Sequence, residues 1–80
     1  MDDRKEKVRL LKVYGAIQGL KQKLEDEIKV FDNLNQHARI DGDTENIMWT
    51  SAHISVRRLV IDELEKITGL IDEMLEEGKQ

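Results

Sequence analysis

The sequence predicts an all-α fold, an antiparallel two-helix hairpin that we expect to dimerise into a four-helix bundle. Three observations support this prediction. Apolar residues recur at steps of three and four along most of the chain, which is the spacing of an amphipathic helix. The pattern is interrupted once, around Gly42. The composition, with 38% charged residues, 4% aromatic residues and no proline, is typical of long helices or coiled coils.

The first helix is expected from about residue 3 to residue 40. Asp2, Asp3 and Glu6 place negative charge near its N-terminus, where that charge stabilises the helix dipole. The residues predicted to form its packing face are Leu10, Val13, Ile17, Leu20, Leu24, Ile28, Phe31, Leu34 and Ala38. Their mean spacing of roughly 3.5 residues favours left-handed, coiled-coil-like packing.

The turn is expected over about residues 41 to 44. Gly42 is suited to the left-handed conformation that ends many helices, and Asp43 or Thr44 is suited to cap the following helix. A connection this short makes the two helices antiparallel neighbours. Residues 1–80 are therefore expected to form a single helical-hairpin domain.

The second helix is expected from about residue 45 to residue 77, and its apolar face is wide. One stripe comprises Trp49, His53, Val56, Val60, Leu64, Ile67, Ile71 and Met74, and a second comprises Ile47, Ile54, Ile61 and Leu75. With Leu59 and Leu70 they cover an arc of roughly 200°, against about 100° for a helix that packs on one surface. Because the chain offers only one other long helix, we expect it to form a homodimer.

The size of the chain also favours self-association. Eighty residues are near the lower limit at which a chain buries enough surface to fold alone. The sequence has no cysteine, so disulfides are excluded and oligomerisation remains as a means of stabilising a small core. The residues expected in the core or the dimer interface are Ile17, Leu24, Phe31, Trp49, Ile54, Val60, Ile61, Leu64, Ile67, Ile71 and Met74.

Two polar residues, Asn35 and His53, are expected in a polar core layer close to the turn. Folding the chain about residues 42 and 43 brings Asn35 beside Trp49 and Thr50, and it brings Phe31 beside His53. Such a layer fixes register, as a buried asparagine does in coiled coils. The alternative interpretation is a small site in which His53 acts as a base, a ligand or a pH switch.

We expect a small non-enzymatic module for protein interaction or regulation, which binds itself and another protein of unidentified nature. No catalytic, cofactor-binding or metal-binding residue is predicted. The Glu-x-x-His pairs of bundle metal sites are absent, because Leu34 stands three residues before His37 and Thr50 three before His53. Residues two apart on a helix point about 200° away from each other, so the serines beside His53 form no catalytic array with it.

Two alternatives remain open. The first is a Rop-like bundle that binds RNA or DNA, an analogy of architecture, since Rop-type regulators are also short hairpins that dimerise. Its candidate basic pair is Arg57 and Arg58, although Arg57 is close enough to the apolar face to pair with Glu27 instead. The second is a Mg²⁺-dependent all-α nucleotide pyrophosphohydrolase, whose paired acidic motifs are absent here. Its candidate ligands are Glu25, Asp26, Glu27, Asp62, Glu63 and Glu65.

Charge and hydropathy bear on the partners and the location of the chain. The net charge of −4 does not attract nucleic acid or an anionic membrane. No apolar run approaches the roughly 20 residues that span a bilayer. We therefore expect a cytoplasmic protein with no membrane contact, and we do not expect nucleic acid as its partner.

Overall fold

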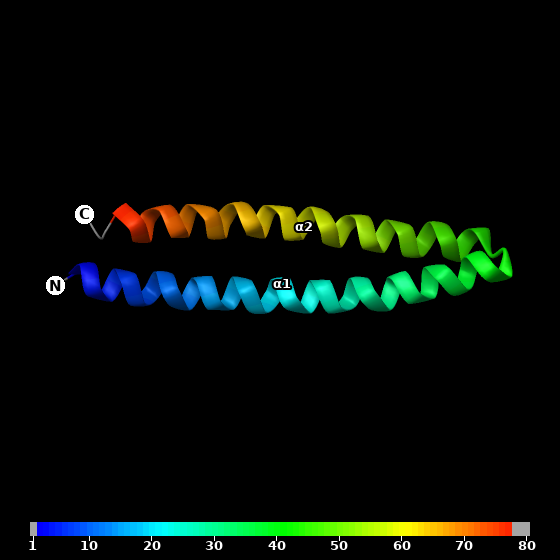
Figure 1. The fold of residues 1–80 in the computed structure, drawn as a ribbon, viewed down its shortest axis with the longest axis horizontal. Coiled ribbons are helices and arrows are strands. Elements are labelled where there is room, and N and C mark those ends of the chain that lie inside the picture. Colours follow the sequence, from blue (N-terminus) through cyan, green and yellow to red (C-terminus); the bar gives the residue numbers. More distant parts are fainter. Residues whose placement is uncertain (1, 78–80) are drawn as a thin grey trace.

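The computed structural model describes the backbone of residues 2–77 and the side chains of residues 4–77. It contains two helices, α1 (Asp2–Asp41) and α2 (Thr44–Glu77), which lie side by side and antiparallel (Figure 1). The hairpin is a thin rod with extents of 61 × 15 × 13 Å. The predicted two-helix hairpin is confirmed. The side chains of Asp2 and Asp3, expected to stabilise the start of α1, lie outside the described side chains.

The end of α1 is closed by the backbone around Gly42. Gly42 has a φ of 69°, the left-handed conformation that only glycine adopts without strain. Its N–H donates to the carbonyl of Arg39 at 3.3 Å, and the N–H of Asp43 donates to the carbonyl of Ala38 at 2.9 Å. These two bonds form a Schellman motif, which satisfies carbonyls that the end of a helix leaves without a partner.

Asp43 also begins α2. Its carbonyl accepts the first helical hydrogen bond from the N–H of Ile47 at 3.0 Å, and its Oδ1 accepts from the N–H of Asn46 at 3.2 Å. These are the two contacts of an N-cap residue. Of the two predicted capping residues, Asp43 rather than Thr44 therefore caps α2. Gly42 alone lies between Asp41, the last residue of α1, and this cap.

The two helices meet along a heptad seam, in which contacting positions alternate in steps of three and four. Every seam residue is buried or half-buried. On α1 the seam consists of Leu10, Tyr14, Ile17, Lys21, Leu24, Ile28, Phe31, Asn35 and Ala38, and on α2 of Ile47, Thr50, Ile54, Arg57, Ile61, Leu64, Thr68, Ile71 and Leu75. Among the described side chains, the buried apolar core is small and consists of Ala38, Ile54, Ile61 and Ile71.

The predicted packing face of helix 1 needs a correction. Val13, Leu20 and Leu34 are about half exposed and do not belong to the seam. Each stands one residue before a seam position, and those positions hold Tyr14, Lys21 and Asn35. Polar residues therefore occupy places at the centre of the helix contact, and α1 is rotated so that the aliphatic side chains flank the seam.

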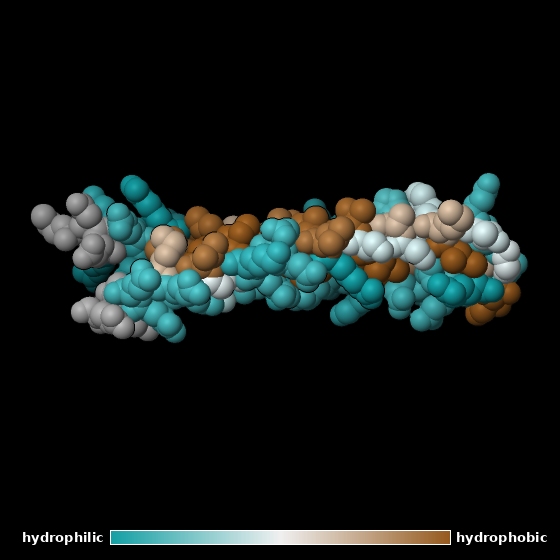
Figure 2. All heavy atoms as spheres, turned by 90° about the horizontal axis from the view of Figure 1, so that it is seen from above, coloured by the Kyte–Doolittle hydropathy of each residue, from teal (hydrophilic) through white to brown (hydrophobic). Residues whose placement is uncertain are grey.

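Apolar side chains that the hairpin leaves uncovered gather on one side of the rod. We call this set the apolar face: Val13, Leu20, Val30 and Leu34 of α1, and Trp49, Val56, Val60, Ile67, Leu70 and Met74 of α2, all exposed. Because the helices are antiparallel, residues that immediately precede seam positions on either helix lie on the same side of the hairpin. Figure 2 shows brown apolar atoms along much of α2, bordered by hydrophilic side chains.

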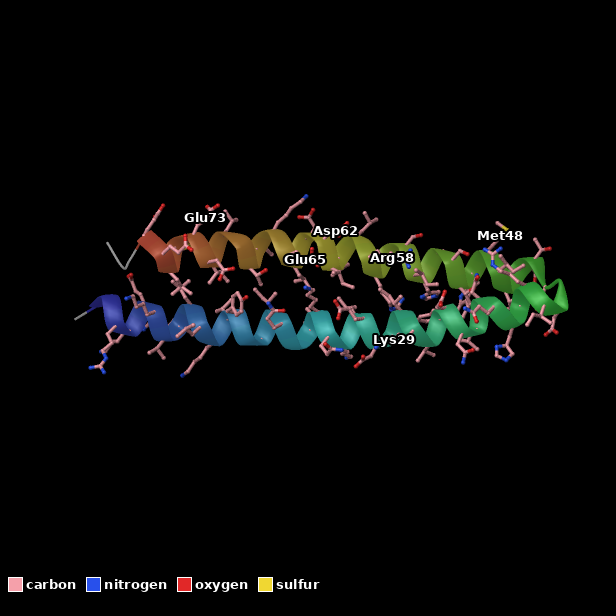
Figure 3. The ribbon with its side chains drawn as sticks, in the orientation of Figure 1. Lys29, Met48, Arg58, Asp62, Glu65 and Glu73 are labelled. Atoms are coloured by element: carbon pink, nitrogen blue, oxygen red, sulfur yellow. The ribbon has the colours of Figure 1, made fainter. Side chains whose placement is uncertain are left out.

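The opposite side of the rod is polar. Lys21 reaches from α1 to Glu65 of α2, with Nζ 3.2 Å from Oε1. Figure 3 shows Glu65 on the inner side of α2, toward α1. Within residues 2–77, neither helix is long and apolar enough to cross a membrane. The hairpin as a whole is thus amphipathic, with one apolar long side and one charged long side.

Candidate functional site

An aromatic cluster occupies the part of the apolar face nearest the turn. The rings of Phe31 and His53 are stacked, with centroids 4.6 Å apart and planes inclined by 8°. Trp49 packs against both rings in T-shaped arrangements, with its centroid 4.4 Å from that of His53 and 5.5 Å from that of Phe31. This cluster joins α1 to α2. It confirms the prediction, made by folding the sequence about residues 42 and 43, that Phe31 lies beside His53.

Arg57 closes the cluster on the side away from the turn. Its guanidinium carbon lies 4.4 Å from the centroid of Phe31, a cation–π contact. Its Nε donates to Oε1 of Glu27 at 3.1 Å, which confirms the predicted pairing of these residues. Its Nη1 lies 3.0 Å from Nδ1 of His53 and 3.1 Å from the carbonyl oxygen of the same residue. Arg57 is therefore engaged within the hairpin.

This contact determines which nitrogen of His53 carries a proton. A guanidinium only donates hydrogen bonds, so Nδ1 of His53 must accept and must be unprotonated. The other histidine, His37, has the opposite arrangement, because its Nδ1 lies 2.9 Å from the carbonyl oxygen of Asn33. A carbonyl only accepts, so Nδ1 of His37 carries a hydrogen. Nδ1 therefore accepts a hydrogen bond in His53 and donates one in His37.

Asn35 forms a separate polar layer, one helical turn nearer to the connection between the two helices. It is 7% exposed, and its Nδ2 lies 2.8 Å from Oγ1 of Thr50, 3.1 Å from Oγ of Ser51 and 3.2 Å from the carbonyl of Ile47. Its Oδ1 accepts from Nε of Arg39 at 2.8 Å. The buried amide is therefore bonded through both its oxygen and its nitrogen.

The structure divides the single polar layer that was predicted for Asn35 and His53. Asn35 bonds to Thr50, whereas His53 contacts Phe31, Trp49 and Arg57. Thr50, only 1% exposed, was missed as a central member because a polar residue does not count in an apolar pattern. The heptad spacing from Ile47 through Thr50 to Ile54 was the signal that would have found it.

The residues predicted for the core or interface fall on two different surfaces. Toward the other helix lie Ile17, Leu24, Phe31, Ile54, Ile61, Leu64 and Ile71, which are buried or half-buried. Facing outward on the apolar face lie Trp49, Val60, Ile67 and Met74. The hairpin therefore buries part of the predicted set in its own packing and leaves the rest exposed.

The carboxylates considered as magnesium ligands do not converge. Glu27 is paired with Arg57, Glu65 with Lys21, and Glu63 with Lys66 at 3.0 Å. Figure 3 shows Asp62 pointing away from α1, whereas Glu65 points toward it. Among the side chains that the structure describes, no three of His, Asp and Glu lie close enough to hold a metal ion.

Among the side chains that the structure describes, two hollows near the aromatic cluster lie along the apolar face. The larger, of about 260 Å³, is at the turn and is lined by Leu34, His37, Ala38, Asp41, Asp43, Asn46, Trp49 and Thr50. The smaller, of about 180 Å³, is lined by Ala52, His53 and Val56. Both are open and mostly apolar, and they lie on either side of Trp49 and His53. Hollows of this kind receive side chains from a packing partner.

No family model, curated protein or solved structure matches this chain. The class that the structure itself defines is an amphipathic antiparallel two-helix hairpin. Any functional conclusion therefore depends on the apolar face, the aromatic cluster and the charges beside them.

Proposed function

We propose that this protein is a non-enzymatic interaction module in which two copies pack through their apolar faces to form a four-helix bundle. One observation carries the proposal: exposed aliphatic and aromatic side chains recur along α2 from Trp49, near its start, to Met74, near its end. Exposed apolar side chains that gather on one face, unlike apolar residues scattered singly, mark an interaction site.

The shape of the face supports a second copy as its occupant. The rod is 61 Å long and only 15 Å wide, and a partner that covers it must be equally long and narrow. A two-fold interface needs a surface that is complementary to itself, and a flat apolar stripe meets this condition. The intramolecular core, which among the described side chains has four buried apolar residues, also gives little stability to an isolated hairpin.

Charges on the face do not oppose this packing. Glu27 lies at its edge but is neutralised by Arg57 of the same chain. Lys23 and Glu63 also precede seam positions and lie on this side; because their charges are opposite, two copies can pair them across the interface instead of bringing like charges together. Packing also fills the hollow beside His53 with side chains, as knobs fill holes in helical bundles.

The bundle presents its outer surface to another protein. Apolar side chains outside the apolar face remain exposed there, including Ile40 and Met48 near the turn and Leu59 on α2. Figure 3 shows Met48 pointing away from α1. Affinity capture from the native cell tests this contact, comparing the wild type with an Ile40→Ser, Met48→Ser variant. A stoichiometric protein that resists nuclease and is lost with the variant is expected, and retention of nucleic acid alone would contradict the proposal.

Neighbouring residues on α2 provide a matched test of the dimer. Val60 belongs to the apolar face and is 39% exposed, whereas Leu59 points outward and is 66% exposed. Val60→Asp places a charge in the proposed interface, which is strongly unfavourable when buried without a partner. Leu59→Asp adds the same charge one residue away but outside it.

Sedimentation equilibrium at micromolar concentration should give a dimer for the wild type and for Leu59→Asp. Val60→Asp should give a monomer or a dimer weakened by at least about a hundredfold. A wild type that sediments as a folded, helical monomer would exclude the proposal. Equal weakening by the two substitutions would show that a different surface carries the association.

A further inference from the structure

We propose that the hollow at the turn holds a lysine or arginine side chain of the other protein that the bundle contacts. The inference rests on that part of the proposed function, and it specifies the chemistry of the partner, a basic segment of chain. Its basis is a hollow of about 260 Å³ whose lining combines apolar side chains with the carboxylates of Asp41 and Asp43.

The backbone of the turn sets where these carboxylates stand. Asp41 ends α1 and Asp43 precedes α2, and Gly42 between them folds the chain back with its left-handed conformation. Leu34, in the apolar part of the lining, precedes Asp41 by seven residues, which is about 10 Å along a helix. The hollow therefore has a charged end at the tip of the hairpin and an apolar end farther along the rod.

The apolar end suits the methylene stem of a basic side chain. Leu34 and Trp49 line it and are about half exposed, so they offer apolar surface to an occupant. The contacts of Trp49 with Phe31 and His53 hold its ring in place. Lysine and arginine bury their stems along apolar surface while the charged group reaches a polar end, and indole is the aromatic ring that binds cations best.

The charged end suits the cationic group. Among the described side chains, neither Asp41 nor Asp43 belongs to an ion pair. Arg39, the basic residue nearest in sequence, donates instead to Asn35. Asp43 accepts two bonds from Asn46, but a carboxylate has about four acceptor sites. An apolar occupant would cover both carboxylates without giving them a partner, which is unfavourable, whereas a cation pairs with them.

A metal ion does not fit this hollow. His37 lines it together with the two carboxylates, yet among the side chains that the structure describes no three of His, Asp and Glu lie close enough to hold a metal. Nδ1 of His37 is also engaged by the carbonyl oxygen of Asn33 at 2.9 Å. A basic side chain needs carboxylates only at its tip, so lysine or arginine is the occupant that matches both ends of the hollow.

The tryptophan in the lining makes occupancy of the hollow observable. Because Trp49 is the only tryptophan of the chain, its fluorescence reports this place alone. The probe is hexalysine, and its control is the same peptide with every side-chain amine acetylated, which keeps the stems and removes the charges. At low ionic strength hexalysine should change the fluorescence saturably, and the acetylated peptide should not.

Three substitutions locate the binding. Asp41→Ala removes one carboxylate from the hollow, and Asp43→Asn removes the other while keeping a good N-cap. Glu45→Ala, the control, removes the same charge at a residue outside the lining. The dissociation constant of hexalysine should rise at least about tenfold in the first two variants and change less than about twofold in the third. Circular dichroism verifies folding, and Asp41→Ala decides if Asp43→Asn does not fold.

The outcomes separate this inference from the proposed function. No binding of hexalysine, equal binding of the acetylated peptide, or equal weakening by Glu45→Ala would overturn the basic occupant and leave the dimer untouched. Hexalysine that binds monomeric Val60→Asp but not the wild-type dimer would assign the hollow to the second copy and overturn its assignment to another protein. A protein captured from the cell that is lost with Ile40→Ser, Met48→Ser but retained by Asp41→Ala would overturn this inference alone.

Discussion

Individual polar residues determine how the two helices align. Asn35, Thr50, Lys21 and Arg57 all occupy seam positions that an apolar pattern would assign to leucine or isoleucine. Each has a specific partner across the seam or beside it. A polar group buried at one such position favours the single alignment in which it is satisfied, so these residues exclude alternative registers more than they add stability.

Substitution of Asn35 tests this role. Asn35→Ala should lower the free energy of unfolding by about 1–3 kcal/mol. It removes the buried hydrogen bond that Asn35 donates to Thr50, and it removes the oxygen that accepts a hydrogen bond from Arg39. Asn35→Leu should preserve or raise stability while loosening register. Urea denaturation measures the first effect, and distances between spin labels on the two helices measure the second. A single sharp distance in Asn35→Leu would contradict the role in register.

At the scale of the elements, glycine has opposite effects in the turn and in the helix. Gly42 adopts a φ of 69°, a conformation in which a residue with a side chain is strained. The two hydrogen bonds that close the end of α1 depend on this conformation. Gly15 and Gly19 lie inside α1, and an added Cβ at either position would meet no atom within 4 Å. Glycine therefore stabilises the turn and weakens the helix.

Alanine at these positions should separate the two effects. Gly42→Ala should lower the free energy of unfolding by about 1 kcal/mol, since alanine resists a positive φ. Gly15→Ala and Gly19→Ala should each raise it by up to about 1 kcal/mol, because alanine is the better helix former and the space is open. Thermal and urea unfolding followed by circular dichroism measure these changes. A loss of stability in Gly19→Ala would indicate that this face is covered in the assembled protein.

At the scale of the whole molecule, folding and assembly are expected to form one transition. Each hairpin buries few apolar side chains completely and exposes a long apolar face, so the second copy contributes a large share of the core. When the folded state is a dimer, its apparent stability depends on protein concentration by mass action.

Thermal unfolding over a hundredfold range of concentration checks this coupling. The Tm of the wild type and of Leu59→Asp should rise by several degrees as concentration increases. Leu64→Asp, which places a charge in the seam between the helices, should abolish folding and association together. A wild-type Tm independent of concentration would show that the hairpin is stable by itself.

The sequence alone determined the elements and the connection between them. Steps of three and four define the two helices, and the local chemistry of Gly42 and Asp43 defines where one ends and the next begins. These features depend on contacts within a few residues, which a single sequence contains. The pairings of Phe31 with His53 and of Glu27 with Arg57 followed as well, because a short turn fixes which residues lie opposite each other.

Only the tertiary structure decided which apolar stripe of α2 faces α1. Ile54 and Ile61 are buried against it, whereas Val60 and Ile67 face outward. Periodicity could not separate these stripes, since both have helical spacing and similar hydrophobicity. The choice depends on polar partners across the seam, such as Asn35 with Thr50 and Glu27 with Arg57, whose bonds form only when both helices are present at one register. The rotation of each helix, and with it the apolar face, is therefore a property of the pair.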